Sequence, residues 1–268
     1  MSARRLVTAL AALVLHAAAS AAPASVFLED LTSPELRDAQ AQGKTTIIIP
    51  VGGTEQSGPQ MALGKHNVRV HLLAARIAEA LGNALVAPVV SYVPEGSVTP
   101  PTGHMRFPGT ISIPDAAFQA LIDGAARSFK QGGFKDVVLI GDHGGYQGQL
   151  KAVAQQLNRD WAATPARAHF IESYYRITQT EFVQTLRAKG LSDAQIGQHA
   201  GSADTSLMLA TDATRVRPDR YDDAARGAPA NGVNGDPRAS SAALGQAGVE
   251  LIVSHSVTAI RQAIAARQ

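Results

Sequence analysis

Cysteine is absent from the 268-residue sequence, and aromatic residues make up 5% of it. The lack of cysteine excludes disulfide bonds, and it means that a bound metal ion would have to be held by histidine, aspartate and glutamate. Because 45% of the residues are hydrophobic although aromatics are few, the core must be built mainly from aliphatic side chains. That composition is typical of an α/β protein with many helices.

Excess charge is also nearly absent. The chain has 24 lysine and arginine residues against 22 aspartate and glutamate residues, and Arg4 and Arg5 at the N-terminus account for the difference. No run of basic residues with interleaved aromatics occurs in the sequence. We therefore expect no nucleic-acid partner.

The first 21 residues have the pattern of a secretory signal peptide. Arg4 and Arg5 precede an apolar run at residues 6–15, which is too short to span a bilayer as a permanent helix, and Ala19-Ser20-Ala21 fits the small-x-small rule for cleavage. The alternative is an alanine-rich first helix of the fold. We expect a signal peptide over residues 1–21, export to the periplasm without a membrane anchor after cleavage, and a single domain over residues 22–268.

Short apolar segments alternate with helical patterns along the rest of the chain. The predicted buried strands are residues 45–51, 84–93, 136–140 and 167–175. The predicted helices are residues 68–81, 114–131, 149–158, 180–189 and 249–265. This alternation indicates one α/β domain with a mainly parallel sheet. Two longer segments, 94–110 and 211–245, interrupt it, and loops of that length are more often functional than not.

Polar side chains follow several of the predicted strands. They are Glu55, Ser57 and His66 after the first strand, Asp142 and His143 after the third, and His199 and Asp204 further along. Ligands of open α/β sheets bind at the carboxyl ends of the strands, and imidazole and carboxylate groups suit Zn²⁺ and Mn²⁺ when no thiolate is available. A metal site is one interpretation. In the alternative, the loop histidines are solvated or hydrogen-bonded, Asp204 caps a helix and Asp142 pairs with a cation.

Five sequence blocks resemble the creatininase family. P50-V-G-G-T-E-Q-S-G-P-Q-M-A-L-G-K-H66 resembles the family's P-V-G-S-T-E-Q-H-G-P-H-L-P-L-x-x-D, and F107-P-G-T-I-S112 matches F-P-G-T-I-S. G133-F-K-D-V-V-L-I-G-D-H-G-G145 is similar to G-F-x-x-x-x-x-x-N-G-H-G-G, H199-A-G-S-A-D-T-S206 to H-A-G-x-x-E-T-S, and G-V-N-G-D-P at residues 232–237 to G-V-x-G-D-P. The blocks occur in the family's order over nearly the whole chain after the leader, which makes the resemblance specific.

The resemblance implies a three-layer α/β/α sandwich that hydrolyses cyclic or linear amide C–N bonds with a pair of divalent metal ions. It also implies that Glu55, His143 and Asp204 are metal ligands and that His199 transfers protons. Because such proteins often assemble as hexamers, we predict a homo-oligomer, with the hexamer as the implied state.

Two of the family's metal ligands are altered in this sequence. Ser57 stands in place of the histidine of E-Q-H-G, and His66 stands in place of the aspartate that bridges the two metals. Asp204 replaces a glutamate as well, but it keeps the charge on an arm shorter by one methylene. A carboxylate can join two cations through its two oxygens, whereas a neutral imidazole offers one lone pair to one metal. We therefore predict one ion per chain, Zn²⁺ or Mn²⁺, held by Glu55, His66, His143 and Asp204.

Three residues are weaker candidates for substrate contact: His104, Ser57 and Asp142. His104 lies where relatives often have a Glu-His pair near the substrate mouth, and Asp142 either orients an imidazole or is an ordinary turn residue. Lys65 either influences which substrate charge is preferred or is a solvated surface residue.

The predicted function is metal-dependent hydrolysis of an amide C–N bond in a small-molecule substrate. A metal-activated water would attack the carbonyl carbon, and His199 or a carboxylate would move the proton to the leaving nitrogen, with Asp204 as a candidate base. The alternative is a non-catalytic exported small-molecule-binding protein that kept the fold.

Overall fold

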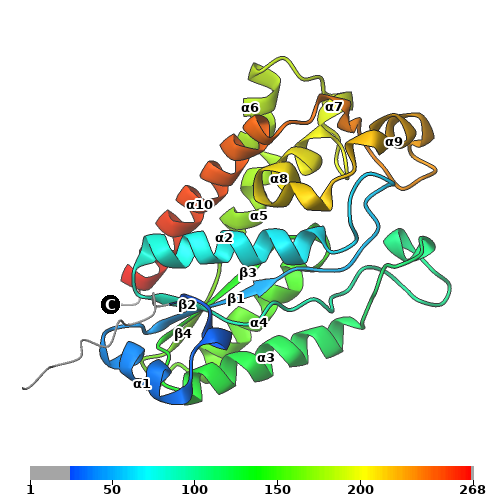
Figure 1. The fold of residues 1–268 in the computed structure, drawn as a ribbon. Helices are drawn as coiled ribbons and strands as arrows, with labels where there is room; N and C mark the ends of the chain where they lie inside the picture. The colour runs from blue at the N-terminus through cyan, green and yellow to red at the C-terminus, as the bar shows by residue number, and fades with distance from the viewer. Residues whose placement is uncertain (1–24, 267–268) are drawn as a thin grey trace, which may run out of the picture.

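A four-stranded parallel sheet forms the centre of the computed structural model, which describes residues 25–266 (Figure 1). The strands are β1 (Thr46–Val51), β2 (Ala84–Val86), β3 (Asp136–Gly141) and β4 (Arg167–Phe170), in the order β2-β1-β3-β4. Each strand pairs with its neighbour in parallel, and Ile48 of β1 lies between Val86 and Val138. The mainly parallel sheet that the apolar segments predicted is confirmed.

Ten α-helices lie around the sheet in the described part of the chain. They are α1 (Ser33–Ala41), α2 (Lys65–Leu81), α3 (Asp115–Gln131), α4 (Gln147–Asp160), α5 (Glu172–Gln179), α6 (Glu181–Ala188), α7 (Asp193–Ile196), α8 (Ser202–Asp212), α9 (Tyr221–Gly227) and α10 (Ala242–Ala265). The five helices that the sequence predicted are α2, α3, α4, α6 and α10. Of these, α2 begins earlier than expected, at Lys65, and α10 begins at Ala242 after a cap from Ser241.

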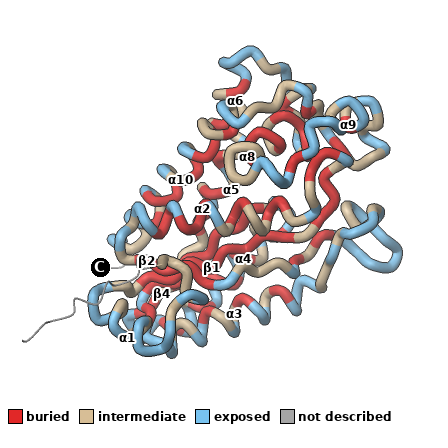
Figure 2. The backbone as a smooth tube through the Cα atoms, viewed as in Figure 1, coloured by how far each residue is buried: buried red, intermediate tan, exposed pale blue. Residues whose placement is uncertain are grey.

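Helices cover both faces of the sheet, so the fold has three layers (Figure 1). Successive residues of β1 point to opposite faces. Ile48 packs with apolar residues of α2, α5, α6, α8 and α10, whereas Ile47 and Ile49 pack with those of α3 and α4. The buried parts of the chain accordingly run along the strands and along the inner sides of these helices (Figure 2). The predicted three-layer α/β/α sandwich is confirmed.

Two of the predicted strands are shorter in the structure than in the prediction. The strand predicted at residues 84–93 ends before Pro88, because proline has no N–H group to donate to the ladder, although Val90 still forms an isolated bridge to β1. The strand predicted at residues 167–175 was wrong in its second half, where α5 begins at Glu172. The apolar residues there pack at helical spacing, which short runs of sequence do not distinguish from a strand.

The two long segments differ from each other. Residues 94–110 contain one short 3₁₀ helix, Gly103–Arg106, whereas residues 211–245 contain α9 and several 3₁₀ turns.

None of the described helices is long and apolar enough to cross a bilayer. The predicted signal peptide, residues 1–21, lies outside the described residues.

Candidate active site

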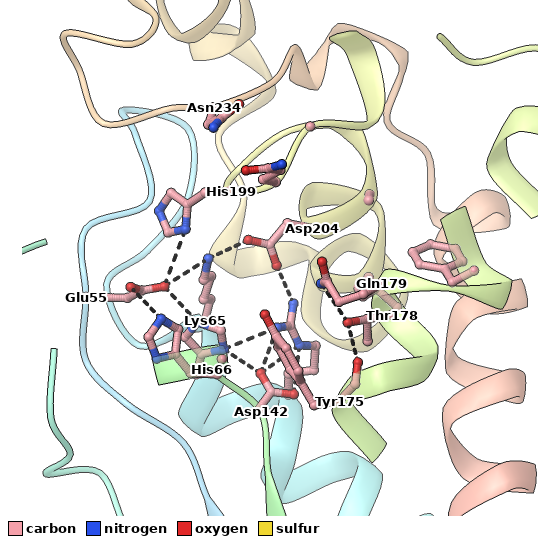
Figure 3. Close-up of a pocket in the computed structure, with 18 of the residues that line it drawn as sticks. Glu55, Lys65, His66, Asp142, Tyr175, Thr178, Gln179, His199, Asp204 and Asn234 are labelled. Carbon is pink, nitrogen blue, oxygen red and sulfur yellow. Dashed lines mark hydrogen bonds and ion pairs between the residues drawn. The ribbon is translucent and has the colours of Figure 1, made fainter. Parts of the chain in front are cut away.

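A cavity of about 380 Å³ lies at the carboxyl ends of β1 and β3 (Figure 3). Its walls come from the loops after these strands, from the first turns of α2 and α8, and from α5. The residues of the sequence analysis that line it are Glu55, Lys65, His66, His104, Asp142, His143, His199 and Asp204. Side chains that are distant in sequence thus meet in one cavity, as expected for groups at the ends of parallel strands.

The hydroxyl group of Tyr146 joins the ends of β1 and β3. It accepts hydrogen bonds from the backbone N–H groups of Asp142 and His143, both at 3.1 Å. It donates its proton toward the carbonyl oxygens of Val51 at 2.8 Å and Gly52 at 2.6 Å. Tyr146 is completely buried, so water does not compete for these bonds. The arrangement fixes the loop after β3 beside the loop after β1.

Glu55 lies at the centre of the site and is completely buried. Its Oε1 atom is 2.7 Å from His66 Nε2, 3.3 Å from Lys65 Nζ and 3.7 Å from His199 Nδ1. Its Oε2 atom is 3.1 Å from His104 Nε2 and 3.5 Å from His143 Nε2. Burial alone would raise the pKa of Glu55, but Lys65 and His66 outweigh it and hold this pKa well below its usual value. Glu55 is therefore an anion at neutral pH.

Two overlapping groups of side chains have the composition and spacing of a metal site. The donor atoms of Glu55, His66 and His143 lie within 4.8 Å of one another, and so do those of Glu55, His104 and His199. The Oε2 atom of Glu55 is buried, and although His104 Nε2 lies 3.1 Å away, it accepts no hydrogen bond of normal geometry from the described residues. A buried anionic oxygen without such bonds is costly, and a cation satisfies it. The residues present therefore fit a divalent metal ion.

The imidazoles of His143 and His199 are neutral at physiological pH. Burial is the main cause, and it lowers the pKa of His143 to about 4 and that of His199 to about 3. His199 Nε2 lies 2.9 Å from the backbone oxygen of Gln56. The Gln56 side-chain amide nitrogen lies farther from the same atom, at 3.2 Å, so we assign the proton to Nε2, which donates it to the carbonyl, and the lone pair to Nδ1, which faces Glu55. His199 can therefore bind a cation or accept a proton inside the cavity.

Asp142 orients His66, which was one of the two roles considered for it. Asp142 Oδ2 lies 2.5 Å from His66 Nδ1, and the same carboxylate accepts hydrogen bonds from Arg69 Nε at 2.9 Å and from the Tyr174 hydroxyl at 2.9 Å. With Nδ1 engaged, His66 presents Nε2 to Glu55. A carboxylate behind a metal-binding histidine is a common arrangement that fixes the ring and raises its basicity.

Asp204 is in the first turn of α8, but the structure does not place it in either metal-type group of the described residues. Its Oδ2 atom contacts Lys65 Nζ, and its Oδ1 atom is 2.6 Å from Arg69 Nη1. It also accepts a hydrogen bond from the backbone N–H of Ala200 at 3.2 Å. Burial opposes ionisation, but Lys65 and Arg69 hold the pKa of Asp204 well below its usual value. The predicted roles of metal ligand and base remain predictions, and the contacts favour a role as partner of the two cations.

Lys65 is not a solvated surface residue, because its side chain is 1% exposed. Arg69, one helical turn further along α2, is 4% exposed and pairs with both Asp142 and Asp204. Burial opposes the charge on Lys65, but Asp204 and Glu55 raise the pKa of this lysine. Two permanent cations are therefore part of the site. A role for Lys65 in the site was one of the two alternatives considered from the sequence, whereas Arg69 was not considered.

The two remaining substrate candidates differ in position. His104, on the 3₁₀ helix of the 94–110 segment, lines the cavity. Ser57 is completely buried and is not among the described residues that line the cavity. Its role in substrate contact remains an untested prediction that its burial does not favour.

Glu95 is a site residue that the sequence analysis missed. It is 5% exposed, and its Oε2 atom is 3.5 Å from His143 Nδ1. Burial and the nearby charge of Glu55 raise its pKa to about 8. Gly53 permits this approach, because its φ is +146° and a Cβ there would lie 2.7 Å from the Glu95 carboxylate. The sequence signal was weak: a single acidic residue in P94-E-G96, within a long loop.

Comparison with known proteins identifies the family to which this sequence belongs. The sequence model of the creatininase family, described as creatinine amidohydrolase, matches residues 29–260. Creatinine amidohydrolase of Pseudomonas putida is 28% identical over 207 residues, which span 74% of this chain and 76% of the relative. Mycofactocin precursor peptide peptidase of Mycolicibacterium smegmatis is 30% identical over 142 residues, which span 50% of this chain and 55% of the relative.

A solved structure confirms the likeness of the fold. The structure described as "Creatininase Mn" has a TM-score of 0.74 to this chain at 26% identity, and the match covers 90% of this chain and 99% of the other. The resemblance read from the five sequence blocks is confirmed.

Proposed function

The chain belongs to the creatininase family, and we propose that it hydrolyses an amide C–N bond of a small molecule in the cavity around Glu55. Enzymes of this family are metal-dependent amidohydrolases, and this chain is an enzyme of that kind. The observation that carries the proposal is the buried Glu55 carboxylate, whose Oε2 accepts no hydrogen bond of normal geometry from the described residues and faces two imidazoles at the cavity.

Glu55, His66 and His143 would hold the metal ion, Zn²⁺ or Mn²⁺. Both histidines direct Nε2 at the Glu55 carboxylate. Each ring also has a partner at Nδ1: the Asp142 carboxylate at His66, and the backbone N–H of Gly145, which donates to His143 at 3.2 Å. Such partners hold a ring in the orientation that a ligand needs. When bound, a divalent ion supplies Lewis acidity that polarises a carbonyl group and makes water more acidic.

Hydrolysis places a hydroxyl group on the carbonyl carbon and a proton on the leaving nitrogen, so a protein group must move that proton. His199 suits this task, because its free Nδ1 faces the cavity and its Nε2 is held by the Gln56 carbonyl. Burial lowers the pKa of His199 to about 3, so its imidazole is neutral and can accept a proton. The contacts of Asp204 with Lys65 and Arg69 make it a poorer base than His199.

The cavity limits the substrate to a small molecule or a narrow chain end. Its volume of about 380 Å³ is near the lower end of the range for small-molecule sites. The two relatives are named for acting on creatinine and on a precursor peptide, which share an amide C–N bond and little else. The amide bond is therefore the feature we assign to the substrate.

The cellular setting is a separate proposal. The N-terminal pattern supports export to the periplasm after cleavage at Ala21, and the family supports a homo-oligomer. Fractionation of cells that express the full chain, followed by native mass measurement of the exported form, tests both points. A cytoplasmic, uncleaved monomer would contradict them.

The decisive test of function is a turnover screen of the mature protein with Mn²⁺ or Zn²⁺ against lactams, lactones, formamides and creatinine. We expect metal-dependent hydrolysis of an amide, and its loss in Glu55→Gln, which keeps the shape of the side chain and removes its charge. Glu79→Gln is the matched control, because Glu79 is exposed on α2. No turnover by the wild type, together with tight binding of a screened compound by metal-free protein, would favour the non-catalytic binding protein instead.

A further inference from the structure

We propose that Lys65 Nζ is a built-in cation of the active site, which fills the space between Glu55 and Asp204 and so restricts the centre to one divalent metal ion. The inference rests on the proposed function, since it concerns the metal capacity of the same site. It assigns Lys65 a positioning role, in which its ammonium group lies between the Glu55 and Asp204 carboxylates, beside the ion that Glu55, His66 and His143 would bind.

The Lys65 side chain is buried between two carboxylates of the site. Lys65 is the first residue of α2, and its side chain reaches into the site and not into solvent, with 1% of it exposed. Its Nζ atom contacts Asp204 Oδ2 and is 3.3 Å from Glu55 Oε1 (Figure 3). Lysine is almost never fully buried unless it is paired, and here both of its partners belong to the cavity wall.

The charged side chains around Lys65 limit the number of divalent ions that the site can bind. Three buried carboxylates meet there, those of Glu55, Asp142 and Asp204, and two permanent cations, Lys65 and Arg69, lie among them. Three anions and two cations leave one net negative charge, before any proton on His66 is counted. One divalent ion turns this into a single positive charge, whereas a second would add a large uncompensated charge in a buried place.

The contacts of Asp204 agree with this count. One of its oxygens faces Lys65 and the other faces Arg69, which in turn reaches Asp142 at 2.7 Å. Removal of the lysine would leave Asp204 and Glu55 as two buried carboxylates without the cation between them. Buried anions of this kind need a cation, and a divalent ion from solution is the available replacement.

The competing explanation is that Lys65 is an ordinary buried ion-pair residue that stabilises α2 and α8. Both explanations predict that removing the ammonium group destabilises the protein, so stability alone does not separate them. They differ in metal binding: a built-in cation keeps a divalent ion out of its place, and an ordinary ion pair does not.

The experiment compares wild type with Lys65→Met, which keeps a long unbranched side chain and removes the charged group. The mature proteins are loaded with Mn²⁺ or Zn²⁺, freed of excess metal and analysed by mass spectrometry of the metal content. We expect the wild type to hold about one equivalent of metal per chain and Lys65→Met about two. Added metal should also raise the midpoint of thermal unfolding of Lys65→Met more than that of the wild type. Lys151→Met, at an exposed position of α4, is the matched control and should hold about one equivalent.

Two further variants locate the second ion. Lys65→Met combined with Asp204→Asn should return to about one equivalent, because the new ion would lose one of its two carboxylates. Asp204→Asn alone should still hold about one equivalent, because Asp204 is a partner of Lys65 and Arg69 and not a ligand of the resident ion. This variant keeps Lys65 and tests the inference even if Lys65→Met does not fold.

The outcomes separate this inference from the proposed function. Any one of three results would overturn the role of Lys65. They are a wild type that holds about two equivalents of metal, a folded Lys65→Met that stays at about one, and an Asp204→Asn that loses its metal. Wild type that binds no metal and hydrolyses no amide would overturn the proposed function itself. The two can also fail separately. If the wild type hydrolyses an amide with one bound ion and Lys65→Met gains no second ion, the proposed function holds and only the inference about Lys65 is wrong.

Discussion

Gly245 marks the closest approach of α10 to α8, and alanine at this position should destabilise the protein and disturb the active site. A Cβ at Gly245 would overlap the backbone carbonyl group of Ser206 and would lie 2.9 Å from the Cβ atom of Ala210. The obstacle is the backbone of a packed helix and not the end of a flexible side chain, so one helix has to move away from the other. This movement would act on the helix that carries Asp204 in its first turn.

The size of the effect follows from two opposing terms. Adding a methyl group to a site with no room costs about 1–3 kcal/mol, at the upper end where backbone blocks it. Replacing glycine by alanine inside a helix returns about 0.5–1 kcal/mol. We therefore expect Gly245→Ala to lower the free energy of unfolding by about 2 kcal/mol, which lowers the melting temperature of a chain of this size by about 4–8 °C.

The assay is thermal and urea unfolding of the metal-free protein, with Gly124→Ala as the matched control. Gly124 is an exposed interior position of α3, and a Cβ there would meet nothing within 4 Å. The same chemical change should therefore stabilise the control by about 0.5–1 kcal/mol. If Gly245→Ala proved as stable as Gly124→Ala, the close packing of α10 on α8 would be refuted.

Three further changes test the site itself. Asp142→Asn should weaken metal binding by about 10–100-fold, because His66 loses the carboxylate that orients it, and an unchanged Kd in titration calorimetry would contradict that role. His199→Ala should lower kcat by about 100-fold or more while the metal content stays the same, whereas loss of the metal would show that the ion binds instead with Glu55 and His104. Tyr146→Phe should cost about 2–3 kcal/mol of unfolding free energy, because it leaves buried backbone groups at the ends of β1 and β3 without their partner, and wild-type stability in urea would contradict this.

The central part of the fold could be predicted from the sequence because its strands are buried on both faces. All residues of β1 and β3 are buried, and such strands have continuous apolar runs that are easy to recognise. The ends of β2 and β4 could not be predicted in the same way. After β2 the chain stays apolar although the ladder stops before Pro88, and after β4 the apolar residues Ile171 and Tyr174 continue into α5 instead of the strand.

Site residues were predictable where they directly follow a strand or lie in a recognisable block, as Glu55 and His143 do. Glu95 was not, because it lies in an irregular loop and reaches the site through the conformation of Gly53, which no local sequence pattern specifies. Tyr146 was not either, because its role depends on a hydroxyl group that reaches across to the neighbouring strand. Contacts between distant segments of this kind follow from the folded structure and not from spacing along the chain.

Lys65 shows how a small error at a helix boundary hides a functional residue. When the helix is taken to begin at residue 68, Leu73 and Ile77 form its apolar face and Lys65 falls in a loop, where a lysine is usually solvated. The helix begins at Lys65 itself, and the stripe that continues back from Ile77 and Leu73 at intervals of four residues then passes through Arg69 and Lys65. Two cations on the core-facing stripe of a helix require buried anions opposite them. The carboxylates at the strand ends supply those anions, so the first turn of α2 belongs to the chemistry of the site as much as to its scaffold.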